Sequence, residues 1–532
     1  MLSRTLFPIF GAILYYVLYY IYRASTYPLR NVRGPRNPSF IFGNFKQLRD
    51  DTQSTKRWRE EFGPVFRFKH LYGIRHLHVS DVKALGHILA NGSVYQRPPS
   101  TNKSRKNLLG SGLLTVEEDD HRRQAKANSC NTPQIGRLTE IFVQKSIQLR
   151  DIWASQLVQE NSLATRVDVF SWLRRMTLDV IGQAGFGYNF DALETTEKPN
   201  ELNHAFTELL HTPDAKYYQL FQFTEAIFPL LKLVPYPGKK VIEHARAEMF
   251  SVAGRIVSDS IRASDGEKSF DSKKDLLSVL LRANLAKNVP ESQRLRDDEV
   301  VSQIPAFLVA GHETSSSAVA WALHALSLDA AVQTKLREEL FTISTENPTM
   351  DELNSLPYLE RQHINSVVRE VLRAYSPVPF LDRMAMQDDV LPLSKPYIDK
   401  AGKSHDSLVI PKGQIIHMPI FAVNTDKEIW GDDAEEFRPA RWENVPVASN
   451  AIPSVWGNQF TFFAGQNNCI GFRFSLVEIK ALLFTLVRAF EFEPAVHKGG
   501  IGSTSSGLQA PVVLAEPERG TSLPLLLKPY NK

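Results

Sequence analysis

The chain has 532 residues, of which 43% are apolar and 23% are charged. This composition is ordinary for a globular protein with a substantial core, so the chain is expected to fold. A formal net charge of +4 is too small to indicate nucleic-acid binding. Two cysteines in so long a chain, Cys130 and Cys469, exclude a disulfide framework and fit a reducing compartment.

The first apolar stretch, residues 6–22, is uncharged and rich in tyrosine. Its length of roughly 17 residues lies at the short end of a membrane-spanning helix. One arginine precedes it and three follow, so the positive-inside rule predicts an N-terminal anchor over residues 1–24, with the body of the protein in the cytosol. A cleaved signal peptide is the alternative, although no small-residue cleavage pattern follows. Prolines then predict a stiff hinge over residues 25–50.

Beyond the hinge, the pattern predicts a mainly helical body with a smaller β-rich part. Partly alternating residues around Tyr72 and Gly73 predict a β-hairpin between Phe66 and Val79. Apolar residues at helical spacing predict helices at 137–157, 169–184, 201–210, 241–261, 276–285, 298–328 and 358–374. The longest pattern corresponds to a helix of about 45 Å, which must be central because it can cross a whole domain.

The stretch that carries most chemistry lies near the C-terminus, where Phe462, Gly465, Cys469 and Gly471 precede an amphipathic helix. Glycine permits positive φ and close backbone approach, so the two glycines could let a loop fold tightly around the sulfur. The positive end of the following helix is expected to lower the pKa of the thiol. The pattern favours a thiolate presented to a metal, and the alternative is a buried cysteine at a helix start.

Inside the predicted helix at 298–328 lie Ala310, Gly311, Glu313 and Thr314. The two small residues would let something flat lie against the helix backbone. Thr314 can hydrogen-bond the carbonyl four residues back and open a local kink. Taken alone, the segment is also consistent with a helix-packing glycine beside solvated polar groups.

Glu370 and Arg373 share one face of the helix predicted at 358–374, so their charges can meet or jointly bind a third group. An isolated pair at this spacing is usually a solvated surface pair. The sequence F-R-P-A-R-W at 437–442 follows shortly before the cysteine loop and contains Arg441.

The order of these four motifs along the chain resembles that of the cytochrome P-450 superfamily: the segment at 310–314, the pair at 370 and 373, the stretch at 437–442 and the cysteine loop. The family's F-x-x-G-x-x-x-C-x-G loop, its A-G-x-E-T segment and its E-x-x-R pair fall on the residues named above. Arg441 holds the position expected in the family's F-x-P-x-R-W stretch. The resemblance covers nearly the whole chain and is greatest to microsomal enzymes of fungi. It implies the cytochrome P-450 fold, mainly α with a smaller β-rich part, in a haem-binding catalytic domain over residues 51–532 with the long central helix over the haem.

The resemblance also implies haem b as cofactor and the roles of the motif residues. Cys469 is expected as the axial thiolate ligand of the iron, pushing electron density onto the metal. Thr314, with Glu313 beside it, is expected to position water and deliver protons to dioxygen. The remaining cofactor contacts expected are Phe462, Gly465, Gly471, Ala310 and Gly311, and the buried structural network expected is Glu370, Arg373 and Arg441.

The chain departs from the family pattern where the haem propionates need cationic partners. Asn467 stands where the family usually has a basic residue, Ala125 stands at the family's propionate-binding arginine, and the segment before Pro133 is shorter. Arg383 fits the remaining propionate-binding position, and His121 is expected as a second. The lost contacts weaken haem retention unless His121, Arg122 or Lys126 replaces them.

Substrate contacts are expected at Phe307, Val378, Phe380 and Leu381, which together predict an apolar pocket for a lipophilic small molecule. Core packing is the alternative for each aromatic side chain. A basic group formed by Arg122, Arg123 and Lys126, if exposed, could attract the acidic surface of a flavoprotein reductase, and a merely solvated basic face is the alternative.

The resemblance therefore implies a single-pass monooxygenase of the endoplasmic reticulum membrane, with its catalytic domain in the cytosol and a role in secondary metabolism. It would insert one oxygen atom of dioxygen into its substrate, using NADPH through cytochrome P-450 reductase, with cytochrome b5 as a second donor. Two alternatives stay open. Glu313 and Thr314 argue against a non-oxygenating haem-thiolate isomerase or dehydratase, whereas Asn467 and Ala125 motivate a haem-binding membrane protein with little turnover.

Overall fold

The computed structural model describes residues 18, 22, 25–50, 54–129, 131–159, 164–194, 201–202, 204–205, 218, 220–225, 228, 231, 234–236, 238–262, 275–285, 289–357, 367–504 and 507–530. Most of the predicted anchor, most of the helix predicted at 201–210, and residues 358–366 lie outside these ranges. None of the helices in the described ranges is both long and apolar enough to cross a bilayer. The chain forms two compact units, 1–96 with 381–419, and 97–380 with 420–532.

The first unit contains the predicted hairpin. Strands β1 (Val65–Lys69) and β2 (Arg75–Val79) pair antiparallel, and Tyr72 and Gly73 turn the chain with φ values of 59° and 71°. The sheet continues in the order β1-β2-β8-β5-β3, with β2 and β8 parallel. The other elements of this unit are β3 (Tyr95–Gln96), β5 (Phe380–Ala385), β6 (Asp389–Ile398), β7 (Ser404–Ile410), β8 (Ile415–Pro419), α2 (Phe45–Asp50), α3 (Ser54–Phe62) and α4 (Val82–Ala90).

Histidines occupy the interior beside this sheet. His76 and His78 of β2 and His417 of β8 are buried. His78 stacks on Phe66, with ring centroids 4.1 Å apart, and Nδ1 of His417 lies 3.1 Å from Oδ1 of Asp382. Burial lowers the pKa of His76 to about 3, so its imidazole is neutral at physiological pH.

The second unit is mainly helical and confirms the predicted fold class. The helices predicted at 137–157, 169–184, 241–261 and 276–285 are present as α7, α8, α11 and α12. The helices are α5 (Pro99–Leu109), α6 (Glu118–Ala127), α7 (Thr132–Gln159), α8 (Val169–Phe186), α11 (Lys239–Arg262), α12 (Leu276–Leu285), α13 (Asp297–Leu328), α14 (Ala330–Leu340), α15 (Met350–Ser355), α17 (Val367–Ala374), α18 (Ile420–Asn424), α19 (Lys427–Trp430) and α20 (Phe472–Ala489). The strands are β4 (Thr165–Asp168), β9 (Phe490–Pro494) and β12 (Pro524–Pro529) in the order β4-β12-β9, and the pair β10 (Ile501–Ser503) and β11 (Pro511–Val513).

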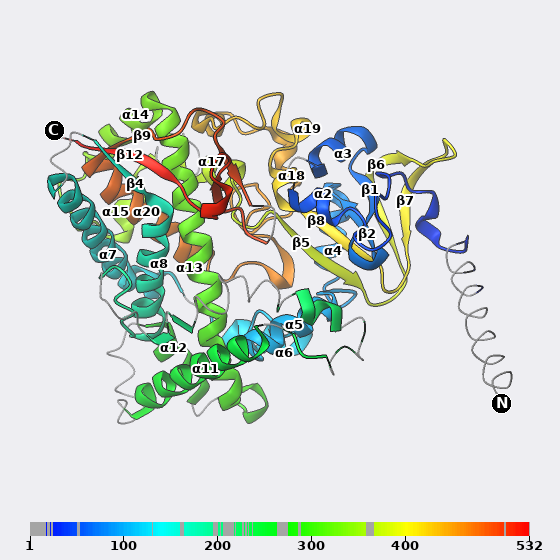
Figure 1. The fold of residues 1–532 in the computed structure, drawn as a ribbon, viewed down its shortest axis with the longest axis horizontal. Helices are drawn as coiled ribbons and strands as arrows, with labels where there is room; N and C mark the ends of the chain where they lie inside the picture. Colours follow the sequence, from blue (N-terminus) through cyan, green and yellow to red (C-terminus); the bar gives the residue numbers. More distant parts are fainter. Residues whose placement is uncertain are drawn as a thin grey trace. The chain divides into compact units, whose positions relative to one another are not determined.

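Helix α13 is the central element of this unit, as predicted. It spans 32 residues, and Glu299 closes a capping box at its start. Three acidic residues in its first turn complement the positive end of the helix dipole. Helices α8, α11, α17 and α20 all contact it, and Figure 1 shows α8 running beside it.

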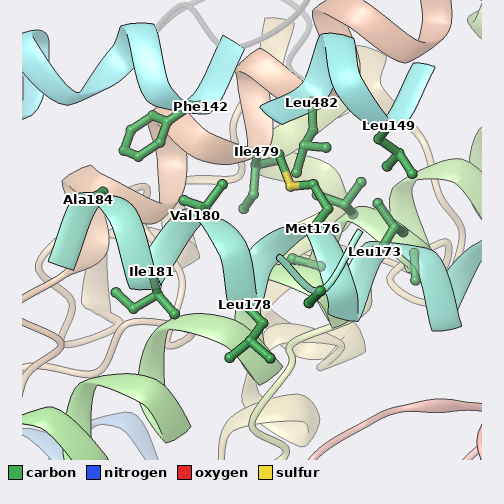
Figure 2. Close-up of a cluster of buried hydrophobic side chains, with 14 of the residues drawn as sticks. Phe142, Leu149, Leu173, Met176, Leu178, Val180, Ile181, Ala184, Ile479 and Leu482 are labelled. Atoms are coloured by element: carbon green, nitrogen blue, oxygen red, sulfur yellow. The ribbon is translucent and has the colours of Figure 1, made fainter. Parts of the chain in front are cut away.

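The core between α7, α8 and α20 fixes α8 in place. Figure 2 shows Met176 and Val180 of α8 turned toward Ile479 and Leu482 of α20 and toward Phe142 of α7. All five side chains are almost fully buried. Burying one side chain of this size contributes about 1.5–3 kcal/mol. One face of α8 is therefore held against the helix that follows the cysteine loop, while α8 also contacts α13.

Candidate active site

Cys469 lies on a tight loop directly before α20. Its backbone N–H donates to the carbonyl of Phe462 at 3.0 Å, which closes the loop. Gly465 has φ 71°, the left-handed conformation for which glycine was expected. Gly471 does not use the positive φ that glycine permits, because its φ is −92° and it serves as the N-cap of α20. Phe463 adopts the second left-handed conformation in this loop, with φ 61°.

The electrostatics of the sulfur differ from the prediction. The residue Cys469 is exposed, yet protein atoms surround its sulfur. This burial raises the pKa of the thiol to about 11, although a hydrogen bond from the Gly471 N–H favours the anion and lowers the pKa. The predicted lowering by the helix end is therefore wrong for the thiol alone, because desolvation of the anion outweighs one amide. A metal ion at the sulfur would reverse this balance, since a coordinating thiol is deprotonated outright.

Helix α13 leaves one stripe of its surface uncovered. Its residues are otherwise mostly buried, but Ala310 is exposed, and Phe307 and Thr314 are only partly covered. These positions share one helix face. A Cβ atom at Gly471 would meet no protein atom within 4 Å. Because protein interiors are close-packed, uncovered surface on a central helix and open space at Gly471 beside Cys469 fit a flat prosthetic group, and a thiolate donor fits haem iron.

The two polar residues of α13 have different partners. The Thr314 hydroxyl donates to the carbonyl of Ala310 at 2.6 Å, as predicted, and the helix continues without interruption. The Glu313 carboxylate is buried and lies 3.0 Å from Nη2 of Arg174 on α8. No motif in the sequence pointed to this arginine, because it is 139 residues away from Glu313 in the chain.

Gly311 lies where α8 approaches α13. A Cβ atom at this position would be 2.9 Å from Cδ1 of Ile181, which is too close for a side chain. The absent side chain lets Ile181 pack directly against α13, which agrees with the helix-packing alternative that the sequence left open. The clearance that Ala310 and Gly311 were expected to provide over a prosthetic group stays a prediction.

The structure joins Glu370, Arg373 and Arg441 in a fully buried network. Arg373 donates to both carboxylate oxygens of Glu370, at 2.9 and 2.8 Å. Nε of Arg441 lies 3.3 Å from the same carboxylate, and Nη1 donates to Asp433 at 2.6 Å. The guanidinium groups also donate to backbone carbonyls of the segment before the cysteine loop, including that of Glu436. The pair is thus a buried support and not a solvated surface pair.

The basic side chains of α6 differ in their exposure to solvent. His121 is buried. Arg123 donates to both oxygens of Glu299 on α13, at 2.8 and 2.9 Å, and its side chain is only 15% exposed. The proposal that Arg123 faces a reductase therefore loses its basis, while Arg122 and Lys126 are exposed.

Asn467 is uncharged, so it places no cation in the cysteine loop. Its Oδ1 is buried and accepts no hydrogen bond from the residues that the structure describes. The neighbouring Gln466 ties the loop to α6, donating from Nε2 to the carbonyl of Glu118 at 2.9 Å. This contact between the two segments that lack the family's basic residues was not foreseen from the sequence.

The predicted substrate residues fall in both units. Phe307, Val378 and Phe380 are partly buried in the second unit. Phe307 stacks on Phe186, with ring centroids 6.4 Å apart. A separate cavity of about 630 Å³ is lined by residues of α7, α8 and α11, including Phe186 and Ile256, and by none of the predicted substrate residues.

Leu381 and Arg383 lie on β5 of the first unit. Leu381 is partly buried, and Arg383 is buried with Nη1 donating to the carbonyl of Asp382 at 3.0 Å. Their predicted contacts with substrate and propionate stay predictions.

A cysteine-ligated haem protein with a helical fold is the class that these features define. The sequence profile of the family described as Cytochrome P-450 matches residues 32–512. The chain is 44% identical over 521 residues to Cytochrome P-450 monooxygenase 205 of Postia placenta, covering 96% of this chain and 95% of that protein. It is 42% identical over 517 residues to Cytochrome P-450 monooxygenase 128 of the same fungus, covering 95% and 93%. It is 31% identical over 514 residues to a ganoderic acid synthetase of Ganoderma lucidum, covering 91% of each.

The chain belongs to the cytochrome P-450 family. The predictions of the family, of a haem-thiolate monooxygenase and of a fungal relationship are confirmed by these matches.

Proposed function

We propose that Cys469 is the iron ligand of this monooxygenase and that Thr314 and Glu313 deliver protons at the uncovered stripe of α13. The observation that carries the proposal is the exposed residue Cys469 on a loop of the same unit in which α13 leaves Ala310 exposed. The haem supplies dioxygen activation and oxygen insertion when it is bound. The protein residues supply binding, orientation and protons.

The loop residues adapt the sulfur to this role. Cys469 would hold the iron as a thiolate, because coordination to a metal would stabilise the anion that burial otherwise disfavours. The Gly471 N–H donates to the sulfur and adjusts the donor strength of the ligand. Phe462 lies between the rings of Trp456 and Phe472, with centroid distances of 5.6 and 5.9 Å, so it can present a fixed aromatic face.

Thr314 can hold a water molecule in one orientation. Its hydroxyl proton is used by the Ala310 carbonyl, so the hydroxyl oxygen remains as an acceptor for a water donor. Glu313, the next residue toward the N-terminus, is a carboxylate that can exchange a proton with such a water. A general acid beside a fixed acceptor is what controlled protonation of dioxygen needs.

The finer assignments extend this proposal. Phe307, Val378 and Phe380 would contact a lipophilic substrate, and the exposed Arg122 and Lys126 would attract an acidic electron donor such as NADPH–cytochrome P-450 reductase or cytochrome b5. Residues 6–22 would anchor the protein in the endoplasmic reticulum membrane. His121 and Arg383 would serve the propionates.

The reduced, carbon monoxide-bound difference spectrum tests the ligand. The wild type is expected to show the Soret band of thiolate ligation, Cys469→Ala to lose it, and the loop control Asn468→Ala to keep it. A thiolate band that survives in Cys469→Ala would refute the assignment. A wild type that binds haem without this band would favour the alternative of a haem protein with little turnover, and absence of reductase-dependent NADPH consumption would favour the isomerase alternative.

A further inference from the structure

Helix α8 contacts the polar segment of α13 through two side chains one turn apart. Nη2 of Arg174 lies 3.0 Å from Oε1 of Glu313. The hydroxyl oxygen of Thr177 lies 3.1 Å from the backbone carbonyl oxygen of His312, and 2.9 Å from that of Leu173 on its own helix, so the two carbonyls share one hydroxyl proton. Residues three apart share a helix face, so α8 holds the side chain of Glu313 and the backbone just before it at the same time.

The ion pair is well shielded from solvent. The side chains of Arg174 and Glu313 are 23% and 9% exposed. The same carboxylate oxygen is 3.4 Å from Nδ1 of His312. A carboxylate with so little access to water depends on its partners, because breaking such a pair leaves an uncompensated charge.

The position of α8 is itself fixed by packing. Ile181 fills the space left by Gly311 on α13, and Met176 and Val180 face the core formed with α7 and α20 (Figure 2). Arg174 is thus attached to a helix that packing holds in place. The position at which its guanidinium group binds the Glu313 carboxylate is therefore set by the fold.

We propose that Arg174 is a positioning residue for proton delivery, holding the Glu313 carboxylate in one place so that protons reach the water at Thr314 from a fixed source. Thr177 contacts the backbone at His312 from the same face of α8. This inference rests on the proposed roles of Glu313 and Thr314. It adds a residue of α8 that none of the sequence motifs contains.

The test uses full-length protein with NADPH and a microsomal reductase, without any substrate. Reduction of dioxygen to hydrogen peroxide takes two electrons and two protons, hence one NADPH. Reduction to two waters takes four electrons and four protons, hence two NADPH. The peroxide released per NADPH therefore reports how often the additional protons arrive.

Arg174→Gln is expected to reduce the water-forming fraction by about tenfold, the lower end of what a hydrogen bond to a charged group is worth. Arg174→Lys should restore most of this fraction, because it returns a cation to the same place. Arg175→Gln is the matched control, since Arg175 is exposed on the same helix and lies over the Trp172 ring. An unchanged peroxide yield in Arg174→Gln, or no recovery in Arg174→Lys, would overturn the role of Arg174.

Thermal melting gives a readout that does not depend on turnover. The melting temperatures of Arg174→Gln, Glu313→Gln and the double variant should be non-additive, with the double variant no less stable than Arg174→Gln alone. Additive shifts would show that the pair does not interact and overturn the inference. A wild type without the thiolate band would instead overturn the proposed function, so the two failures can be told apart.

Discussion

Replacing Glu370 by glutamine is the sharpest test of how the cysteine loop is supported. Four N–H donors converge on the carboxylate, namely Nε and Nη2 of Arg373, Nε of Arg441 and the backbone N–H of Arg438. Glutamine keeps the size but offers one acceptor oxygen and one NH₂ group. Whichever way the amide is oriented, its NH₂ group meets a donor, and two buried guanidinium groups lose their shared counter-charge.

The cost follows from burial. Glu370 and Arg373 are fully buried and Arg441 is 2% exposed, so solvent cannot replace the missing charge. Breaking a pair of this kind costs about 3–5 kcal/mol. Domains are stable by only about 5–15 kcal/mol, so the loss is a large part of the total. Glu370→Gln should therefore lower the urea midpoint and the yield of haem-loaded protein.

Glu478→Gln is the matched control on α20. Glu478 is as buried as Glu370, but no cation among the described residues pairs with it, and its carboxyl group has only the Ser315 hydroxyl nearby, in a geometry too poor for a regular hydrogen bond. Burial raises the pKa of Glu478 to about 8, although the nearby Ser315 lowers it slightly, so the group is mainly neutral at pH 7. Its replacement by glutamine removes little charge and should change the free energy of unfolding by less than about 1.5 kcal/mol, which leaves the urea midpoint nearly unchanged. Equal midpoints for the two variants would refute the reasoning, because burial alone would then explain the effect.

Three further predictions concern Thr314, Asn467 and two histidines of the first unit. Thr314→Val should raise peroxide release per NADPH while keeping the thiolate band, because it removes the acceptor for water but leaves Cys469 untouched; an unchanged peroxide yield would contradict this role. Asn467→Arg should slow the transfer of haem to apomyoglobin by adding a cation where Oδ1 has no described partner, and unaltered transfer would show that the propionates do not depend on this position. Burial lowers the pKa of His70 to about 4 and of His76 to about 3. The free energy of unfolding should therefore fall as the pH drops from about 6.5 toward 4, by up to about 1.4 kcal/mol per pH unit for each of these histidines. The unfolded chain takes up protons in this window and the folded chain does not, so a urea midpoint independent of pH, or the same slope in His76→Phe, would argue against it.

The agreement between sequence and structure is best where the signal is local. The 3.6-residue periodicity set the bounds of α7, α8, α11, α12 and α13 to within five residues, because a buried stripe on a helix repeats in the sequence itself. The left-handed conformation of Gly465 was anticipated from the residue type alone, since few residues other than glycine adopt φ 71° at low cost.

Agreement was poorest where a property depends on burial. The pKa of the Cys469 thiol was expected to fall and is raised, because the number of protein atoms around a sulfur cannot be read from its neighbours in sequence. Arg123 was expected at the surface and instead pairs with Glu299, 176 positions away. Both errors come from judging a side chain by its own segment.

The sequence by itself therefore determined the family, the cysteine presented to iron, the acid and hydroxyl on the long helix, and the pairing of Glu370 with Arg373 at a spacing of one helical turn. Only the tertiary structure decided which partners these groups have. Arg174 reaches Glu313 and Arg441 reaches Glu370 across long stretches of chain. Local patterns encode which face of a helix is buried, but the partner on that face is fixed by how the helices pack.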